Sequence, residues 1–280
     1  MKIAIILNYF NEKIINYAKE LTILLKNNGH EIWLHKQMKD KIFDVNYVQS
    51  HDKLKEKVDI FFALGGDGTI IHTASHSDGK PILGINMGRI GYLANFEYSE
   101  TEKILTVISS DFDCEERMLI EIKSGEKVIG NALNDGVISA YLSKLLDFEV
   151  DIDDSRFKYR ADGLIFSTPT GSTAYALSAG GPVVDSSISC MLFTPICPHS
   201  LFNRSIVLSP NTVLKVKVLP KYKEKVILTI DGRDPYEIRE NEELSFTASD
   251  KKVKLIKGNQ KNFFDLVNKK LIVPGINKDI

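Results

Sequence analysis

The chain has 280 residues, a formal net charge of -1 and a pI near 6.6. This length allows one large domain or two smaller ones, and the balanced charge excludes the strongly basic surface with which proteins bind nucleic acid or anionic membranes. Three cysteines without a CxxC pair argue against a disulfide framework. The apolar run within residues 1–13 is too short to span a membrane, so we expect a soluble, cytoplasmic protein without a signal peptide.

The first hundred residues alternate between apolar runs and one amphipathic pattern. The runs predict strands over residues 2–8, 30–35 and 81–86, and the spacing of apolar residues over 14–25 predicts a helix that ends at Asn28-Gly29. A strand, a helix and a second strand in this order predict a small parallel sheet with helices on its faces. Ligands of such sheets bind at the carboxyl ends of the strands.

A central stretch, residues 58–74 with the sequence VDIFFALGGDGTIIHTA, carries the strongest signal in this region. Residues 58–64 form an apolar run typical of a strand buried on both faces. The glycines that follow let the backbone approach a ligand closely, and a helix from Thr69 onward presents free N–H groups to the turn. The pattern predicts a phosphate site, although it matches neither GxxxxGK[ST] nor GxGxxG.

Asp67 is the unusual member of this turn, because a carboxylate beside a bound anion is unfavourable unless a metal or a reacting hydroxyl lies between them. An alternative is that Asp67 only caps the helix by accepting backbone N–H bonds. The residues alone leave both roles open.

From Arg117 onward the pattern changes to short alternating runs, which predict a mostly β domain of sandwich type. The predicted strands lie within residues 117–124, 127–140, 148–154, 157–167, 213–219, 225–232 and 243–249. A helix over 99–109 leaves the first domain, and one over 263–271 returns to it. We therefore expect an α/β domain over 1–100, a mostly β domain over 101–260 and a returning segment over 261–280.

Two places in the β region favour a ligand. Asn134 and Asp135 precede Gly136, where the alternative is a two-residue hairpin turn. In residues 159–184 a strand runs into STPTGST and then into a helix predicted over 173–179, an insertion that a sandwich does not need. Its hydroxyls suit a ligand rich in hydroxyl groups, so we expect a nucleotide or dinucleotide between the two domains.

Metal ligands are not evident in the sequence. Cys197, Pro198 and His199 form a small cluster, but no second cluster stands at ligand spacing, so we predict no metal site there. The six histidines are otherwise scattered along the chain, and only His72 falls within a motif.

Along nearly its whole length the chain resembles the bacterial NAD kinases. The matching pieces are GGDGT at 65–69, LND at 133–135, ADGLIFSTPTGSTAYALSAGGPVV at 161–184, TPICPHSL at 194–201 and IDG at 230–232. The resemblance implies an N-terminal α/β domain and a C-terminal β domain with the active site between them, in a homodimer or homotetramer. It implies transfer of the γ-phosphoryl of ATP to the 2′-hydroxyl of the adenosine ribose of NAD, giving NADP, with a divalent ion such as Mg²⁺.

The same resemblance implies a role for individual residues of the first domain. Asp67 corresponds to the general base that takes the 2′-hydroxyl proton, and Gly68 lines the same pocket. His72 stands where the family often has a basic residue near the phosphate, with an ordinary surface histidine as the alternative.

In the second domain the resemblance implies a set of nucleotide-binding residues. Asn134 and Asp135 resemble the pair that holds the adenine and ribose of NAD, and Asp162 of the Arg160-x-Asp162 pair faces the nicotinamide end. A further set borders the nucleotide or makes a polar contact to it, and comprises Lys144, Thr173, Ala174, Tyr175 and Ser178.

Two departures and two alternatives accompany this hypothesis. Arg233 stands where many relatives have Gln, which bears on the preference for NAD or NADH, and Ser205 stands where many relatives have Pro. A lipid kinase would need a membrane-facing amphipathic stretch that is not evident here, and a non-catalytic dinucleotide sensor would be expected to lack Asp67. The phosphoryl donor, ATP, another triphosphate or polyphosphate, stays open.

Overall fold

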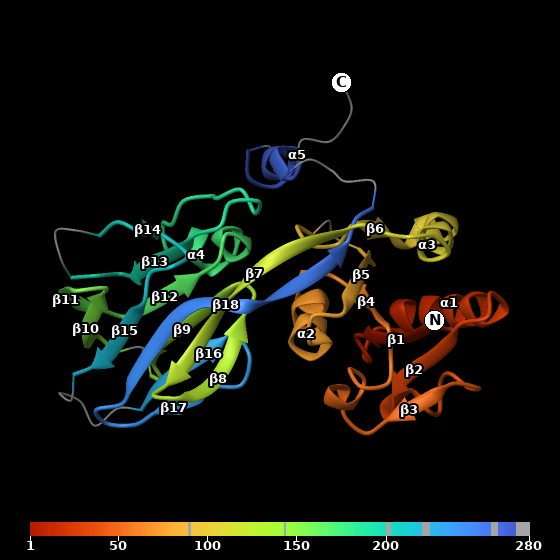
Figure 1. Cartoon of the computed structure of the whole chain (residues 1–280), viewed down its shortest axis with the longest axis horizontal. Helices are drawn as coiled ribbons and strands as arrows, with labels where there is room; N and C mark the ends of the chain where they lie inside the picture. Colours follow the sequence, from red (N-terminus) through yellow and green to blue (C-terminus); the bar gives the residue numbers. More distant parts are fainter. Residues whose placement is uncertain (89–90, 143, 200–202, 220–224, 259–262, 273–280) are drawn as a thin grey trace. The chain divides into compact units, whose positions relative to one another are not determined.

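The computed structural model describes all residues except 89–90, 143, 200–202, 220–224, 259–262 and 273–280 (Figure 1). The chain divides into two compact units. Unit 1 comprises Met1–Glu116 and Val253–Ile280, and unit 2 comprises Arg117–Lys252. The units therefore change at residues 116/117 and 252/253, whereas the expected domain ranges change at 100/101 and 260/261.

Unit 1 is built on a parallel sheet with the strand order β5-β4-β1-β2-β3. The strands of this part are β1 (Lys2–Leu7), β2 (Glu31–His35), β3 (Asn46–Val48), β4 (Ile60–Gly65), β5 (Pro81–Asn86) and β6 (Phe96–Glu97), which pairs with β5. The chain runs outward from β1 through β2 to β3 and then returns to the other side of β1 at β4. The carboxyl ends of β1 and β4 therefore form the switch point at which open α/β sheets bind ligands.

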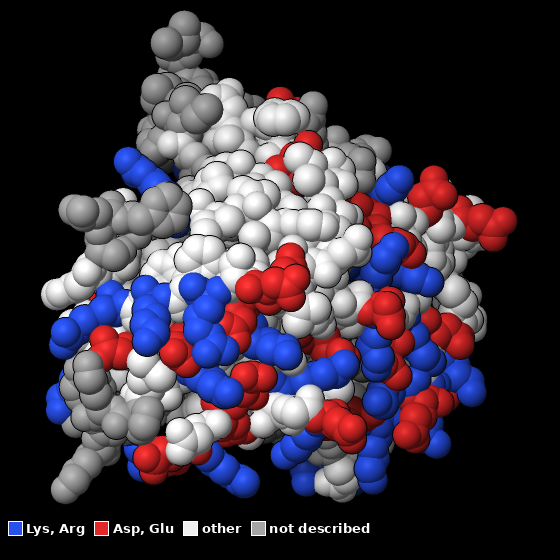
Figure 2. All heavy atoms as spheres, turned by 60° about the vertical axis from the view of Figure 1, so that its left-hand side comes forward, with Lys and Arg blue, Asp and Glu red and all other residues white. Residues whose placement is uncertain are grey.

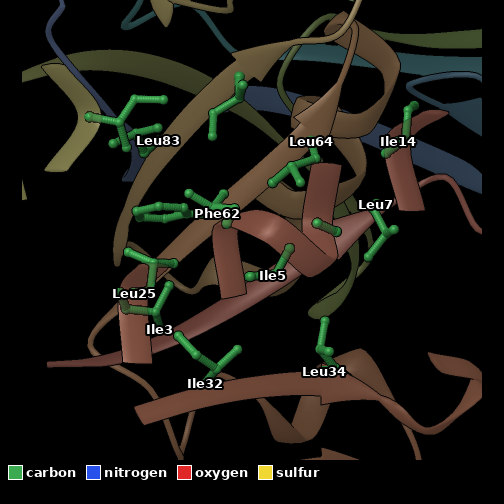
Figure 3. Packing of buried hydrophobic residues seen from close by; sticks show 14 of the residues in the cluster. Ile3, Ile5, Leu7, Ile14, Leu25, Ile32, Leu34, Phe62, Leu64 and Leu83 are labelled. Carbon is green, nitrogen blue, oxygen red and sulfur yellow. The ribbon is translucent and has the colours of Figure 1, made fainter. Parts of the chain in front are cut away.

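The core of unit 1 follows from its apolar strands. Every residue of β4 is buried, as is all of β1 except Lys2, which is the pattern of strands covered on both faces. Figure 3 shows Phe62 and Leu64 of β4 packed with Ile5 of β1 and with side chains of α1. The helices are α1 (Glu12–Asn27), α2 (Asp67–Ser77), α3 (Thr101–Ile108) and α5 (Phe263–Val267). The parallel α/β prediction is confirmed.

Local chemistry sets the ends of the first helix. The Asn11 side chain accepts a hydrogen bond from the Ile14 amide at 3.3 Å, which satisfies one of the free N–H groups of α1. At the other end Gly29 has φ +79°, the left-handed conformation that glycine adopts without steric cost. The helix predicted over 14–25 thus forms with one further turn.

Short helical segments complete unit 1. They are η1 (Lys36–Met38), η2 (His51–Lys53), η3 (Tyr98–Glu100) and η5 (Asn268–Ile272), the last of which is a π-helix. The predicted returning segment, 261–280, is described only in part, since 261–262 and 273–280 lie outside the described residues. Before it, Asn95 Nδ2 donates to the Ile256 carbonyl at 2.8 Å, so the end of β18 (Glu243–Ile256) belongs to unit 1.

Unit 2 contains two sheets. One is antiparallel with the order β14-β13-β12-β9-β16-β17; its strands are β9 (Asp135–Ala140), β12 (Gly163–Ser167), β13 (Met191–Ile196), β14 (Ile206–Leu208), β16 (Val226–Ile230) and β17 (Tyr236–Ile238). The other contains β18 and the strands β7 (Cys114–Ser124), β8 (Lys127–Ala132), β10 (Leu146–Ile152), β11 (Ser155–Ala161) and β15 (Leu214–Val218).

A single apolar core joins these two sheets. Phe166 of β12 and Phe246 of β18 stack with their ring centroids 3.9 Å apart, although their strands belong to different sheets. Gly136 of β9 leaves the room that this packing needs, because a Cβ there would lie 2.6 Å from Ile122 Cδ1 of β7. The predicted mostly β domain with two packed sheets is confirmed.

At two places the chain passes from one sheet to the other within a stretch for which the sequence pattern predicted a single run. β8 pairs with β7, whereas β9 pairs with β12 and β16, so the alternative of a hairpin turn at Asn134-Asp135 is wrong. The run over 157–167 is likewise two strands, because β11 pairs with β10 and β12 with β9 and β13. Asp162 is the single residue between them.

The charged side chains form no large area of one sign on the face shown in Figure 2, where Lys and Arg are interspersed with Asp and Glu. Ion pairs of unit 2 include Arg156 with Asp151 at 2.7 Å and Lys217 with Glu243 at 3.0 Å. No helix in the described part of the chain combines the length and apolarity needed to cross a bilayer.

Candidate active site

The GGDGT turn lies where β4 ends and α2 begins, at the switch point of the parallel sheet. Gly65 is the last residue of β4, Gly66 is the N-cap of α2 and Asp67 is its first helical residue. A Cβ on Gly65 would lie 2.1 Å from Thr69 Oγ1, so only glycine allows the helix to start this close to the strand. The free amides of the first turn of α2 can therefore face an anion, as predicted for a phosphate site.

Asp67 is held by the loop that follows β5 rather than by its own helix. Its carboxylate accepts hydrogen bonds from the backbone amides of Tyr92 at 2.8 Å and Leu93 at 3.0 Å. A Cβ on Gly91 would lie 2.0 Å from Asp67 Oδ1, so this loop fits closely around the carboxylate. No side chain caps the start of α2, and both oxygens of Asp67 bond to the loop after β5. The geometry therefore does not support the alternative that Asp67 only caps the helix.

Lys270 of η5 is a cation that lies near this carboxylate. Its ammonium lies 4.0 Å from the centre of the Tyr92 ring, a cation–π contact. Burial lowers the pKa of Lys270, and the negative charge of Asp67 acts in the opposite direction. Unit 1 thus sets a half-buried carboxylate, a free helix N-terminus and a cation close together.

His72, the third predicted site residue on α2, belongs to a group of imidazoles. Its Nε2 lies 3.1 Å from Nδ1 of His51 in η2, and its ring centroid lies 4.8 Å from that of His76. Burial and the neighbouring imidazoles lower the pKa of His51 to about 4. His72 is therefore a half-buried member of this group, and its contact with phosphate stays a prediction.

In unit 2 a buried aspartate organises the predicted LND stretch. Asp231, in the turn after β16, has φ +51° and a side chain that is 2% exposed. Its carboxylate accepts the backbone amides of Leu133, Asn134 and Asp135 at 3.0, 2.7 and 3.1 Å, and also Arg233 Nη2 at 3.2 Å. The IDG turn therefore fixes the backbone of the LND stretch.

The STPTGST loop closes on the same stretch from another side. Thr168 donates from its amide to the Asn134 carbonyl at 2.9 Å and from its hydroxyl to the Leu133 carbonyl at 2.6 Å. A Cβ on Gly171 would lie 2.1 Å from the Asn134 carbonyl oxygen. Three motifs far apart in sequence thus form one rigid group of loops, in which Asn134 stays partly exposed.

Two carboxyl groups in these loops have altered acidity. Burial first, and then the charge of Asp231, raises the pKa of Asp135 to about 7. Burial also raises the pKa of Asp231, although its three backbone hydrogen bonds and Arg233 oppose that effect. Ionisable groups with such shifts often occur at binding sites.

The prediction of one continuous helix over 173–179 is wrong, because two short helical segments meet there at a non-helical residue. Thr173 ends the 3₁₀ segment η4 (Thr170–Thr173), and Ala174 has the non-helical angles φ −101° and ψ −130°. Tyr175 and Ser178 then begin and end α4 (Tyr175–Ser178). Tyr175 is 47% exposed, so its ring is available to a ligand.

The remaining predicted residues lie elsewhere in unit 2. Arg160 Nε lies 3.6 Å from Asp147 Oδ1, and its carbonyl accepts the His199 amide at 2.7 Å. Asp162 and Lys144 are exposed. Among the predicted residues, Asp67, Gly68 and His72 therefore share α2 of unit 1, and Asn134 and Asp135 share the rigid loops of unit 2.

Sequence reasoning missed the role of Asp231, although the IDG motif was part of the pattern. It also missed the gathering of the histidines, for which the spacing of four between His72 and His76 on a helix was an available signal. At one departure from the family pattern, the hydroxyl of Ser205 lies 2.8 Å from that of the buried Thr194. Proline could not make this contact.

The fold and the two sets of loops define a class of protein. In this class an α/β unit carries a glycine turn between a strand and a helix, and an antiparallel β-sandwich unit carries a second group of loops.

Comparisons with known proteins identify the family within this class. The model of the ATP-NAD kinase N-terminal domain matches residues 3–112, and that of the ATP-NAD kinase C-terminal domain matches residues 133–258. An NAD kinase of Acetivibrio thermocellus is 34% identical over 280 residues, with 97% of each chain covered. One of Caldanaerobacter subterraneus is 35% identical, covering 96% of this chain and 98% of the relative. The chain belongs to the NAD kinase family.

Solved structures agree with this assignment at the level of the fold. A crystal structure of yeast NADH kinase complexed with NADH has a TM-score of 0.86 at 24% identity and covers 100% of this chain and 90% of the yeast chain. An NAD kinase from Archaeoglobus fulgidus in complex with ATP has a TM-score of 0.78 at 26% identity, covering 96% and 98%.

Proposed function

We propose that this protein is an NAD kinase that transfers the γ-phosphoryl group of ATP to the 2′-hydroxyl of the adenosine ribose of NAD. Membership of the NAD kinase family over nearly the full length supports this reaction. The observation that carries it is the position of Asp67, a carboxylate at the first residue of α2 beside free helix amides.

In the proposed step Asp67 accepts the proton of the 2′-hydroxyl. The ribose oxygen then forms a bond to the γ-phosphorus while the bond to the departing ADP breaks, so the protein supplies alignment and one proton acceptor. Each carboxylate oxygen of Asp67 accepts one backbone N–H, which leaves a lone pair free for the ribose hydroxyl. The two amides fix the orientation of the base before substrate arrives.

The divalent ion expected with ATP, Mg²⁺, prefers oxygen ligands and is usually bound through one or two carboxylates and the substrate phosphates. Asp67 could be one such carboxylate beside the phosphates, because its oxygens retain lone pairs that accept no backbone N–H. When bound, the ion would neutralise charge on the phosphates. We propose that Mg²⁺ enters with the triphosphate.

The loops of unit 2 are proposed to hold the dinucleotide. Asn134 and Asp135 would bind the adenine and ribose, Tyr175 would offer a ring face, and Asp162 would lie at the nicotinamide end. Support comes from the exposed ring of Tyr175 and from the fixed backbone of Asn134. The other predicted contacts to the nucleotide stay predictions and comprise Arg160, Thr173, Ala174, Ser178 and Lys144. A cytoplasmic location and a homodimeric or homotetrameric assembly also stay predictions.

The test is to incubate the purified protein with NAD, ATP and Mg²⁺ and to measure NADP with an NADP-specific dehydrogenase. We expect turnover by the wild type and its loss in Asp67→Asn. Polyphosphate in place of ATP tests the donor. If a folded protein that binds NAD makes no NADP with either donor, the sensor alternative replaces the kinase; no observed feature favours that alternative or a lipid substrate.

A further inference from the structure

Four of the six histidines gather at the carboxyl edge of the parallel sheet in unit 1. His35 ends β2, His51 lies in η2 shortly after β3, and His72 and His76 lie on α2. The ring centroids of His35 and His51 are 4.9 Å apart, and those of His51 and His76 are 5.4 Å apart. The proposed phosphoryl transfer uses none of these rings except, by family resemblance, His72.

Three of these side chains have the geometry of a ligand set. His72 and His76 are four residues apart, which places them on one face of α2, and His51 approaches that face from η2. One ligand nitrogen from each of the three rings lies within 4.8 Å of the others. Among the residues that the structure describes, no other group of three His, Cys, Asp or Glu side chains meets this condition.

We propose that His51, His72 and His76 bind a divalent transition-metal cation of the zinc class, one ion per chain. Two nitrogens on one tetrahedral zinc lie about 3.3 Å apart, given Zn–N bonds of about 2.05 Å. Nδ1 of His51 and Nε2 of His72 are already 3.1 Å apart. Neutral imidazoles suit zinc, copper, iron and nickel, whereas Mg²⁺ and Ca²⁺ prefer oxygen, so this site differs from the one expected for Mg²⁺ with ATP.

Outer contacts orient two of the three rings. The hydroxyl of Tyr9 lies 2.6 Å from Nε2 of His51, which directs Nδ1 of that ring toward the ion. Nδ1 of His76 donates to Asp52 Oδ1 at 2.7 Å, which leaves its Nε2 as the ligand nitrogen. A metal-bound histidine almost always donates its second nitrogen to a carboxylate, a carbonyl or water in this way. The arrangement leaves a fourth tetrahedral position for water or another ligand.

Occupancy of this site would connect two elements of unit 1. His72 lies five residues after Asp67 on α2, while His51 lies in η2 beyond the edge strand β3. A bound ion would hold the helix that begins at Asp67 against η2, and would thereby stabilise unit 1. It would also engage His72 with metal rather than with phosphate.

The test measures metal binding directly, without nucleotide. Wild-type protein is treated with chelator, dialysed and titrated with ZnCl₂ in a calorimeter. We expect one ion per chain, affinity at least tenfold weaker in His51→Gln and in His76→Gln, and unchanged affinity in the control His30→Gln. Asp52→Asn should weaken binding by about 10- to 100-fold, as is typical of an outer-shell partner.

Two further readouts separate binding from folding. Circular dichroism of each variant without metal reports whether it folds, and Co²⁺ in place of Zn²⁺ should give the visible absorption of a tetrahedral site in wild type but not in His76→Gln. Absence of stoichiometric binding by the wild type would overturn the proposal. So would equal binding by all variants, which would assign the zinc to other groups such as the cysteines. Neither result bears on the proposed kinase reaction.

Discussion

Each unit contains an aspartate that backbone amides hold in place, and the two differ in exposure. Asp67 of unit 1 accepts two amides and is half-buried, whereas Asp231 of unit 2 accepts three amides and one arginine nitrogen and has a side chain only 2% exposed. The same chemistry thus serves two purposes. A carboxylate that retains open lone pairs can accept a proton, and one that is fully enclosed fixes the loops around it.

The largest effect should come from removing the proposed base. We expect Asp67→Asn to lower kcat by about 10³-fold, within the range of general-base catalysis, with little change in NAD affinity. The side-chain NH₂ group of the new asparagine cannot accept a hydrogen bond, so the variant loses one of the two bonds that the carboxylate accepts from backbone N–H groups. Calorimetric NAD binding therefore serves as the check that the variant folds. Retention of most of the turnover would remove Asp67 from the base role.

The corresponding change in unit 2 should reduce stability. Asp231→Ala leaves three backbone amides without their acceptor, at a cost of about 3 kcal/mol or more in the free energy of unfolding. Urea denaturation followed by far-UV circular dichroism measures this loss, and the fluorescence of the single tryptophan, Trp33, reports unit 1 separately. The exposed Asp234→Ala is the matched control, expected within about 0.5 kcal/mol of wild type. Equal stability of the two variants would contradict the role of Asp231.

A glycine pair tests whether the setting of Asp67 matters as well as its charge. A Cβ on Gly91 would lie 2.0 Å from Asp67 Oδ1, whereas a Cβ on Gly88 meets nothing within 4 Å. We expect Gly91→Ala to lower kcat by about 10- to 100-fold, because small displacements of a reacting group are costly, and Gly88→Ala to leave it unchanged. Equal kcat values in the two variants would mean that the loop does not position the carboxylate.

The sequence was sufficient to predict the elements whose signal is local. The strand predicted over 81–86 forms with those bounds as Pro81–Asn86, and the glycine turn follows a buried strand as expected. Apolar runs and glycines report burial and backbone freedom within a few residues, so they can be interpreted without knowledge of the rest of the chain.

Non-local contacts could not be predicted in this way. Whether Asn134 lies in a hairpin depends on β9 pairing with β12 and β16, which are distant in sequence. Asp231 is fixed to the LND stretch across about a hundred residues, with sequence separations of 96 to 98. The approach of His51 to His72 likewise depends on the order of strands in the sheet. The pattern of side chains indicates which face of a strand or helix is buried, whereas the strands and residues that it contacts depend on the topology of the fold.

The smallest effect concerns the pH dependence of stability, and it extends the comparison to the neighbour of Asp231. The pKa of Asp135 is raised to about 7 in the folded protein, from an ordinary value near 3.8, so between these pH values the folded state binds more protons than the unfolded state. The free energy of unfolding should therefore fall as pH rises from about 4 to about 7, by at most about 1.4 kcal/mol per pH unit for this group.

Asp135→Asn removes this titration, so its unfolding free energy should depend less steeply on pH in that window. Asp231, whose pKa is also raised, contributes a slope of the same sign that remains in the variant. Urea denaturation at several pH values from 4 to 8 measures the difference in slope between wild type and variant. Parallel curves would show that Asp135 carries its charge in the folded protein throughout this range, which would contradict the effect of burial on its pKa.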